Sequence, residues 1–105
     1  MQTFVMLSRL APDMLSSPRS FEQLERAAME RIRKECPDII WKHNYATVGP
    51  WDYIDIFEAP DIEAATRMSA LIRSFGHAQT EIWGAVDWGR FKEIVHSLPG
   101  AKANA

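Results

Sequence analysis

The chain has 105 residues, a net charge of −2 and a charged fraction of 25%, a size and composition typical of one globular domain. A net acidic chain is not expected to bind nucleic acid, because that affinity depends on clustered lysine and arginine side chains. A single cysteine excludes an intrachain disulfide, and no apolar run approaches the roughly 18 residues of a membrane span. Since the N-terminus is also unlike a signal peptide, we expect a cytoplasmic protein that binds neither nucleic acid nor membrane.

Strand, helix and strand patterns follow one another in the first half of the chain. Residues 3–10 are predicted to form a central strand, because apolar side chains occupy both of its faces. A helix is predicted to start near Ser17 and Pro18 and to end before Pro37, which cannot continue it. Residues 39–48 are predicted to form the second strand. The predicted apolar stripe of the helix consists of Phe21, Leu24, Ala28 and Ile32.

Two residues mark the ends of a helix in the second half of the chain. Asp61 can cap this helix, because its carboxylate accepts hydrogen bonds from the free N–H groups of the first turn. Gly76 is placed to end the same helix in a left-handed conformation. The predicted elements of this half are a turn at 49–51, a strand at 53–57, a helix at 61–75, a strand at 79–86 and a short helix at 87–98.

The order of these elements, β-α-β-β-α-β followed by a terminal helix, predicts a ferredoxin-like α+β fold. Both longer helices then cover one face of a four-stranded antiparallel sheet. In this interpretation residues 1–98 form a single domain and residues 99–105 form a flexible tail.

The uncovered face of this sheet is predicted to be strongly aromatic. If Pro50 is the centre of the hairpin turn, Tyr45 lies opposite Asp55 and His43 lies opposite Phe57. The residues predicted on this face are Trp41, His43, Tyr45, Tyr53, Asp55 and Phe57. Because such a face is too apolar to lie bare in water, we expect two copies to pack it across a two-fold axis as a homodimer.

The hairpin and its surroundings resemble the GYD-domain family, which is named for a Gly, Tyr, Asp signature at this turn. The matching residues are Gly49, Asp52, Tyr53, Ile54, Glu58, Ala59, Pro60, Asp61, Gly76, Thr80 and Glu81. Trp51 replaces the eponymous tyrosine, and Ile82 replaces the usual threonine. The resemblance covers most of residues 3–86. It implies the dimeric α/β-barrel superfamily, which includes small monooxygenases, isomerases, haem-related enzymes and amino-acid-sensing regulatory domains.

Asp55, His43 and Tyr45 form the sharpest group of candidate catalytic residues. A carboxylate between aromatic residues on a half-buried strand must be paired, shift its pKa or face a wet cavity. With a raised pKa, Asp55 is suited to general acid or base catalysis, while Tyr45 can donate a hydrogen bond and His43 can titrate near neutral pH. The alternative is a hydrogen-bonded polar pair that sets the register of the dimer.

We expect the homodimer to enclose a small organic ligand in a barrel cavity. The expected ligand-binding residues are Trp41, Trp51, Asp52, Tyr53, Phe57 and Glu81. Glu81 belongs to this set only if it faces the same side of the sheet as Asp55. Residues 49–52 have a purely structural alternative as turn residues.

Two other functions fit the same residues. One is a cofactor-independent monooxygenase or isomerase, in which Asp55 or His43 removes a proton from an activated carbon. The other is an accessory subunit that joins a larger complex through the C-terminal helix at 87–98. We expect no cofactor and no metal, since the three histidines are not at ligand spacing on one element and no phosphate-binding loop is present. Cys36 is interpreted as a packing residue.

Overall fold

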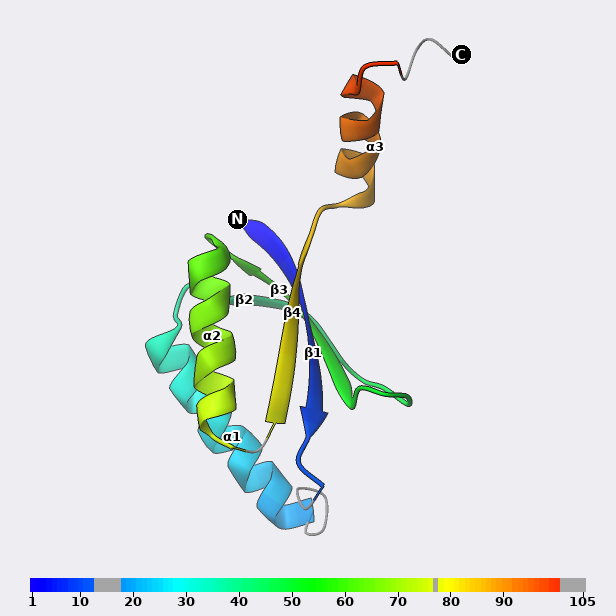
Figure 1. The fold of residues 1–105 in the computed structure, drawn as a ribbon. Coiled ribbons are helices and arrows are strands. Elements are labelled where there is room, and N and C mark those ends of the chain that lie inside the picture. The colour runs from blue at the N-terminus through cyan, green and yellow to red at the C-terminus, as the bar shows by residue number, and fades with distance from the viewer. Residues whose placement is uncertain (13–17, 77, 101–105) are drawn as a thin grey trace.

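The computed structural model describes residues 1–12, 18–76 and 78–100 and has the predicted order of elements (Figure 1). They are β1 (Gln2–Leu10), α1 (Pro18–Glu35), β2 (Ile40–Ala46), β3 (Tyr53–Ala59), α2 (Ile62–Ser74), β4 (Ala78–Ala85) and α3 (Trp88–Ser97). All strand pairs are antiparallel and the strand order is β2-β3-β1-β4, which confirms the ferredoxin-like α+β fold. Ser17 of the predicted helix start and residues 101–105 of the predicted tail lie outside the described residues.

β1 is a central strand with two apolar faces, as its sequence predicts. It pairs with β3 on one side and with β4 on the other. Phe4 and Met6 are almost fully buried beneath the helices. Val5 and Leu7 alternate with them and therefore point to the opposite face.

The ends of α2 follow the two sequence signals predicted for them. Asp61 is the N-cap, and its Oδ1 accepts a hydrogen bond from the Ala64 N–H at 2.9 Å. Gly76 has a φ of 75°, which is the left-handed conformation expected just after a helix. α3 begins in a similar way, because the Asp87 carboxylate accepts from the Gly89 N–H at 2.9 Å.

The core lies between one face of the sheet and the two helices α1 and α2 (Figure 1). We call this the covered face. Cys36 is buried in the core, which confirms its interpretation as a packing residue. The core residues are Phe4, Met6, Ile32, Cys36, Phe57, Ala59, Ala65, Met68 and Ile72.

The hairpin loop between β2 and β3 is fastened to the end of β1. Asp52 Oδ2 accepts a hydrogen bond from the Leu10 N–H at 2.7 Å, and the Asp52 N–H donates to the Ser8 carbonyl at 2.8 Å. The Arg9 guanidinium lies over the Trp51 ring, 4.8 Å from its centre. Its Nε also donates to the Pro50 carbonyl at 2.9 Å. We call the two Asp52 hydrogen bonds the loop latch; they are long-range contacts where the sequence suggested local turn bonds.

The observed strand pairing of the hairpin differs by one residue from the register predicted from the sequence. Ala46 pairs with Tyr53, so that six residues, 47–52, connect the strands. Asn44, and not Tyr45, therefore lies opposite Asp55. A further irregularity lies between Trp41 and His43, where a bulge at Lys42 shifts the register again. His43 lies opposite Ile56 through the same one-residue shift, and the bulge then places Trp41 opposite Phe57, the partner predicted for His43.

Tyr53, Asp55 and Phe57 of β3 lie on the covered face, which corrects their predicted place on the uncovered face. Phe57 is fully buried and Asp55 is only 4% exposed. The reason is steric: the Phe57 ring fills the layer beneath the helices, with its centre 5.5 Å from that of Phe4 and 5.7 Å from that of Trp41. The smaller aliphatic residues of β3 take the other side of the strand.

We call the side of the sheet opposite α1 and α2 the open face. Alternation along the paired strands places aliphatic, aromatic and acidic residues on it. The open-face residues are Val5, Leu7, His43, Tyr45, Ile54, Ile56, Glu81 and Trp83. Tyr45 and Trp83 are each more than half exposed.

α3 stands away from the rest of the molecule at the end of β4 (Figure 1). None of its residues is buried. The radius of gyration is 17.2 Å, compared with about 13 Å for a typical 100-residue domain. The helix therefore does not seal an end of its own sheet.

Candidate functional site

The face of α1 that points to the sheet changes from apolar to acidic along the helix. Glu25, Met29, Ile32 and Cys36 follow the i, i+4, i+7, i+11 spacing of one helical face. Ile32 and Cys36 are buried in the core, whereas Glu25 is exposed. An acidic residue therefore occupies the position at which this spacing would place the next core side chain.

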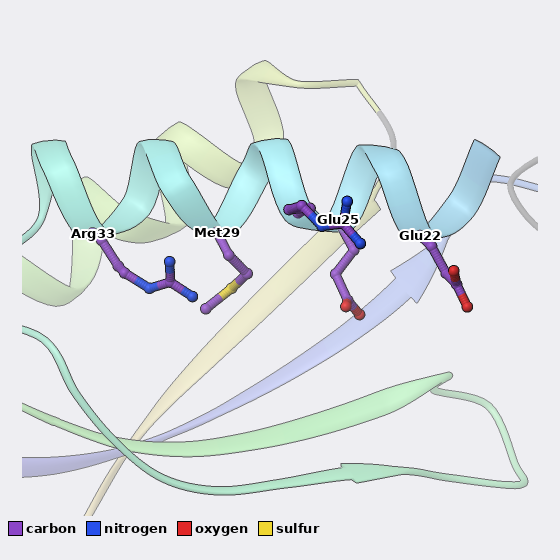
Figure 2. A pocket seen from close by; sticks show the side chains of 5 residues that line it. Glu22, Glu25, Met29 and Arg33 are labelled. Carbon is purple, nitrogen blue, oxygen red and sulfur yellow. The ribbon is translucent and has the colours of Figure 1, made fainter. Parts of the chain in front are cut away.

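A hollow of about 440 Å³, open to solvent, lies along the same face of α1. Figure 2 shows the labelled side chains extending from the helix toward the sheet. Carboxylates stand at the N-terminal end of the row and a guanidinium at the other, with a methionine between them. The lining residues are Glu22, Glu25, Arg26, Met29 and Arg33.

The sheet presents a second polar group toward α1. Asp55 is buried on the covered face of β3, and the Asn44 side-chain amide donates a hydrogen bond to its Oδ1. Tyr53 lies two residues before Asp55 on the same face and pairs with Ser8 of β1. Asp55, Asn44, Tyr53 and Ser8 thus bring a carboxylate, an amide and two hydroxyls together. With Glu25 above them, we call these the polar cluster.

The electrostatics of the polar cluster favour protonated acids. Burial raises the pKa of Asp55, the hydrogen bond from Asn44 opposes this shift, and the charge of Glu25 adds to it. Burial also raises the pKa of Tyr53, with the Ser8 hydroxyl acting against the shift and the Asp55 charge acting with it. Asp55 is therefore suited to hold or accept a proton.

Ser8 has a buried hydroxyl whose hydrogen-bonding capacity is not used. Its side chain is fully buried, and its Oγ finds no partner of hydrogen-bonding geometry among the residues that the structure describes. The Ser8 side chain nevertheless acts to lower the pKa of Tyr53, which places the two hydroxyls close together. A buried hydroxyl without a well-formed hydrogen bond costs free energy.

Three of the predicted site residues lie on the open face, away from Asp55. His43 and Tyr45 are neighbours there, with ring centres 6.1 Å apart. Glu81 pairs with Leu7 and shares that face, which answers the question of its orientation. The structure therefore does not bring His43, Tyr45 or Glu81 together with Asp55.

The other predicted ligand-binding residues have structural contacts. Phe57 and Trp41 pack in and against the core. Asp52 makes the loop latch, and Trp51 lies beneath the Arg9 guanidinium. Tyr53 alone among these residues belongs to the polar cluster.

Glu25, Asn44 and Ser8 were not among the predicted site residues. Glu25 carried a detectable signal, because it continues the helical spacing of Met29 and the residues after it. Asn44 and Ser8 carried none, since their places depend on the hairpin register and on pairing with β3.

Two searches of the described ranges found nothing. No group of three or more His, Cys, Asp or Glu side chains in residues 1–12, 18–76 and 78–100 is arranged to hold a metal ion. Over the same residues, no helix is long and apolar enough to cross a membrane.

Comparisons with known proteins agree with the fold. The family model of the GYD domain matches residues 4–95, which confirms the resemblance seen in the sequence. The crystal structure of FFRP-DM1 is similar, with a TM-score of 0.54 and 23% identity over 82% of this chain and 100% of that chain. At3g17210 from Arabidopsis thaliana gives a TM-score of 0.55 with 13% identity, over 83% of this chain and 95% of that chain. No curated protein matches. At these identities the two structures support the fold alone.

Proposed function

The chain belongs to the GYD-domain family, and we propose that it uses this fold to bind a small organic molecule between α1 and the sheet. The observation that carries the proposal is the buried carboxylate of Asp55 close to a second acid, Glu25, which lines an open hollow along α1. Such an arrangement costs stability unless a hydrogen-bond donor fills it. A ligand would supply that donor.

The chemistry of the polar cluster selects a class of ligand. Asp55 and Glu25 accept hydrogen bonds, and the unpaired Ser8 hydroxyl can either donate or accept. A molecule with an amine or hydroxyl group fits these partners, and Glu22 and Glu25 at one end of the hollow favour an amine there, whereas Arg26 and Arg33 oppose it further along. Met29, in the middle of the hollow, offers an apolar contact for the body of the same molecule.

Native mass spectrometry tests for such a ligand directly. Freshly purified protein is expected to carry an added mass that disappears under denaturing conditions. In the Asp55→Asn variant, which keeps the shape of the side chain and removes its charge, the added mass is expected to fall sharply.

A thermal-shift series with small amines and polyols gives the second readout. Stabilisation by an amine is expected to be lost in Asp55→Asn and reduced in Glu25→Gln. Glu81→Gln is the matched control, because it removes a carboxylate from the opposite face of the sheet. Equal responses in all three variants would contradict the proposed site.

We also propose that the protein is a homodimer joined through the open face. Two exposed aromatic side chains, Tyr45 and Trp83, flank the aliphatic residues of this face. A two-fold axis would cover both copies of the patch at once. Sedimentation is expected to give a dimer for the wild type and a shift toward monomer for Trp83→Glu, with Ala70→Glu, at an exposed position of α2 on the other side of the sheet, as the control.

Proton transfer by Asp55 is a second candidate function, favoured by its raised pKa and burial. Asp55 would act with Tyr53, since His43 lies on the other face. If a bound molecule contains an acidic C–H, that position is expected to exchange with solvent deuterium in the wild type. Exchange at an unchanged rate in Asp55→Asn would exclude this role.

A further inference from the structure

The apolar side of α3 has no partner in its own chain. Trp88 is 69% exposed and Phe91 is 43% exposed, although their rings lie 5.2 Å apart and shield one another in part. The apolar stripe of the helix consists of Trp88, Phe91, Ile94, Val95 and Leu98. A stripe of this size on an isolated ten-residue helix needs a cover, because helices this short are marginal in water without packing.

The polar side of α3 does not select a charged partner. Arg90 and Glu93 form an ion pair at 2.9 Å on the side away from the stripe, so that they satisfy one another. The surface that covers α3 is therefore expected to be apolar.

The position of the helix indicates which surface this is. α3 follows directly from β4, an edge strand that carries the exposed Trp83 on the open face. Val86, also exposed, lies between Trp83 and Trp88 in the chain. The apolar stripe of α3 thus begins five residues after Trp83, an exposed aromatic residue of the face that the proposed homodimer buries.

We propose that α3 is an exchanged arm, which packs its apolar stripe on a second copy of this chain. The inference rests on the proposed homodimer and adds to it a second contact region. Under two-fold symmetry the α3 of each copy packs on the body of the other copy, so both apolar stripes are covered in the dimer. The extension of α3 away from its own sheet is what allows it to reach the other copy (Figure 1).

Sedimentation of helix variants measures the contribution of the arm. The double variant Trp88→Ala with Phe91→Ala is expected to raise the dimer dissociation constant at least tenfold. Arg90→Ala with Glu93→Ala is the matched control: it changes two residues of the same helix, keeps the net charge and leaves the stripe intact. The control is expected to dimerise like the wild type.

The outcomes separate the arm from the dimer itself. A monomeric wild type would overturn both proposals. A wild-type dimer whose dissociation constant does not change in the stripe variant would overturn only the arm, and the open-face dimer would stand. Circular dichroism of each variant shows whether the body remains folded.

A crosslinking experiment identifies what the helix touches. The photoreactive amino acid benzoylphenylalanine is placed at position 88, and this protein is mixed with an isotope-labelled wild type and illuminated. Crosslinks between light and heavy chains are expected. Crosslinks found only within one chain would show that α3 folds back on its own body, and would overturn the proposal.

Discussion

Two regions of the same layer, one beneath α2 and one beneath the first half of α1, are built in opposite ways. Beneath α2, Ala65 and Met68 are fully buried against the sheet, and the Thr80 hydroxyl is paired with that of Ser69 at 2.7 Å. Beneath α1, Asp55 is buried close to Glu25, which lines an open hollow, and the Ser8 hydroxyl has no partner of hydrogen-bonding geometry among the described residues.

The difference separates what holds the fold from what is available to a ligand. In the α2 region no buried side-chain nitrogen or oxygen of the described residues lacks a hydrogen-bond partner. In the α1 region a buried carboxylate and a buried hydroxyl remain costly. A buried carboxylate and a buried unpaired hydroxyl lower the stability of the fold, so their presence indicates a role other than stability. We therefore expect the α1 region to be functional and the α2 region to stabilise the fold.

The largest expected effect is a loss of stability on disrupting the packed core around Phe57. Phe57→Ala removes a fully buried ring that contacts Phe4 and Trp41, and is expected to lower the free energy of unfolding by about 3–5 kcal/mol. Met29→Ala, at the half-buried edge of the hollow, is expected to cost less than half as much. Urea denaturation measures both. Similar losses in the two variants would remove the distinction between the regions.

Removal of the loop latch is expected to cause the second largest loss of stability. Asp52→Ala leaves the Leu10 N–H without its acceptor and is expected to cost about 1–3 kcal/mol. Asp52→Asn keeps a carbonyl oxygen at the same place and is expected to recover most of that loss. If the asparagine variant were as unstable as the alanine variant, the charge of Asp52 and not its hydrogen bond would be the important property.

Asp55→Asn is expected to increase stability at neutral pH, by about 1 kcal/mol, the usual scale for a buried polar group. Since burial raises the pKa of Asp55 in the folded state, the folded protein binds this proton more tightly than the unfolded chain. Wild-type stability therefore falls as the pH rises from the ordinary carboxyl range through the raised pKa. The variant should lack this fall, which thermal unfolding between pH 4 and neutral would reveal.

Glu25→Gln is expected to have the smallest effect of these variants, a change in the pKa of Asp55. It tests whether Glu25 and Asp55 interact. Removing its charge should lower the pKa of Asp55, by less than burial raises it, because burial is the larger cause. Carbon NMR titration of the Asp55 carboxyl measures the change. An unchanged pKa would mean that the two carboxylates are not coupled across the hollow.

Local signals in the sequence predicted most of the fold. The cap at Asp61, the left-handed Gly76 and the two apolar faces of β1 are all as predicted, because each depends on a few neighbouring residues. Tyr53, Asp55 and Phe57 of β3, together with Trp41, lie on the covered face and not on the predicted one, whereas His43 and Tyr45 lie on the uncovered face as predicted. The choice of face depends on the latch between Asp52 and Leu10, which joins residues 42 positions apart and has no local signature.

The candidate site was predicted only in part, for the same reason. Asp55 stood out as a carboxylate on a half-buried strand, and its burial confirms that part of the argument. Its neighbours depended on a register that was wrong by one residue, so Asn44 replaces Tyr45 beside it. Glu25 could have been found by extending the spacing of the buried residues of α1 toward its N-terminus.

The bulge at Lys42 has a consequence for comparing members of the family. It divides β2 into two segments whose residues alternate out of phase, so that Trp41 reaches the core layer while His43 lies on the open face. In a relative that lacks the extra residue, an ungapped alignment would equate side chains from opposite faces. Position 42 is therefore where an alignment gap belongs before the chemistry of this strand is compared between homologues.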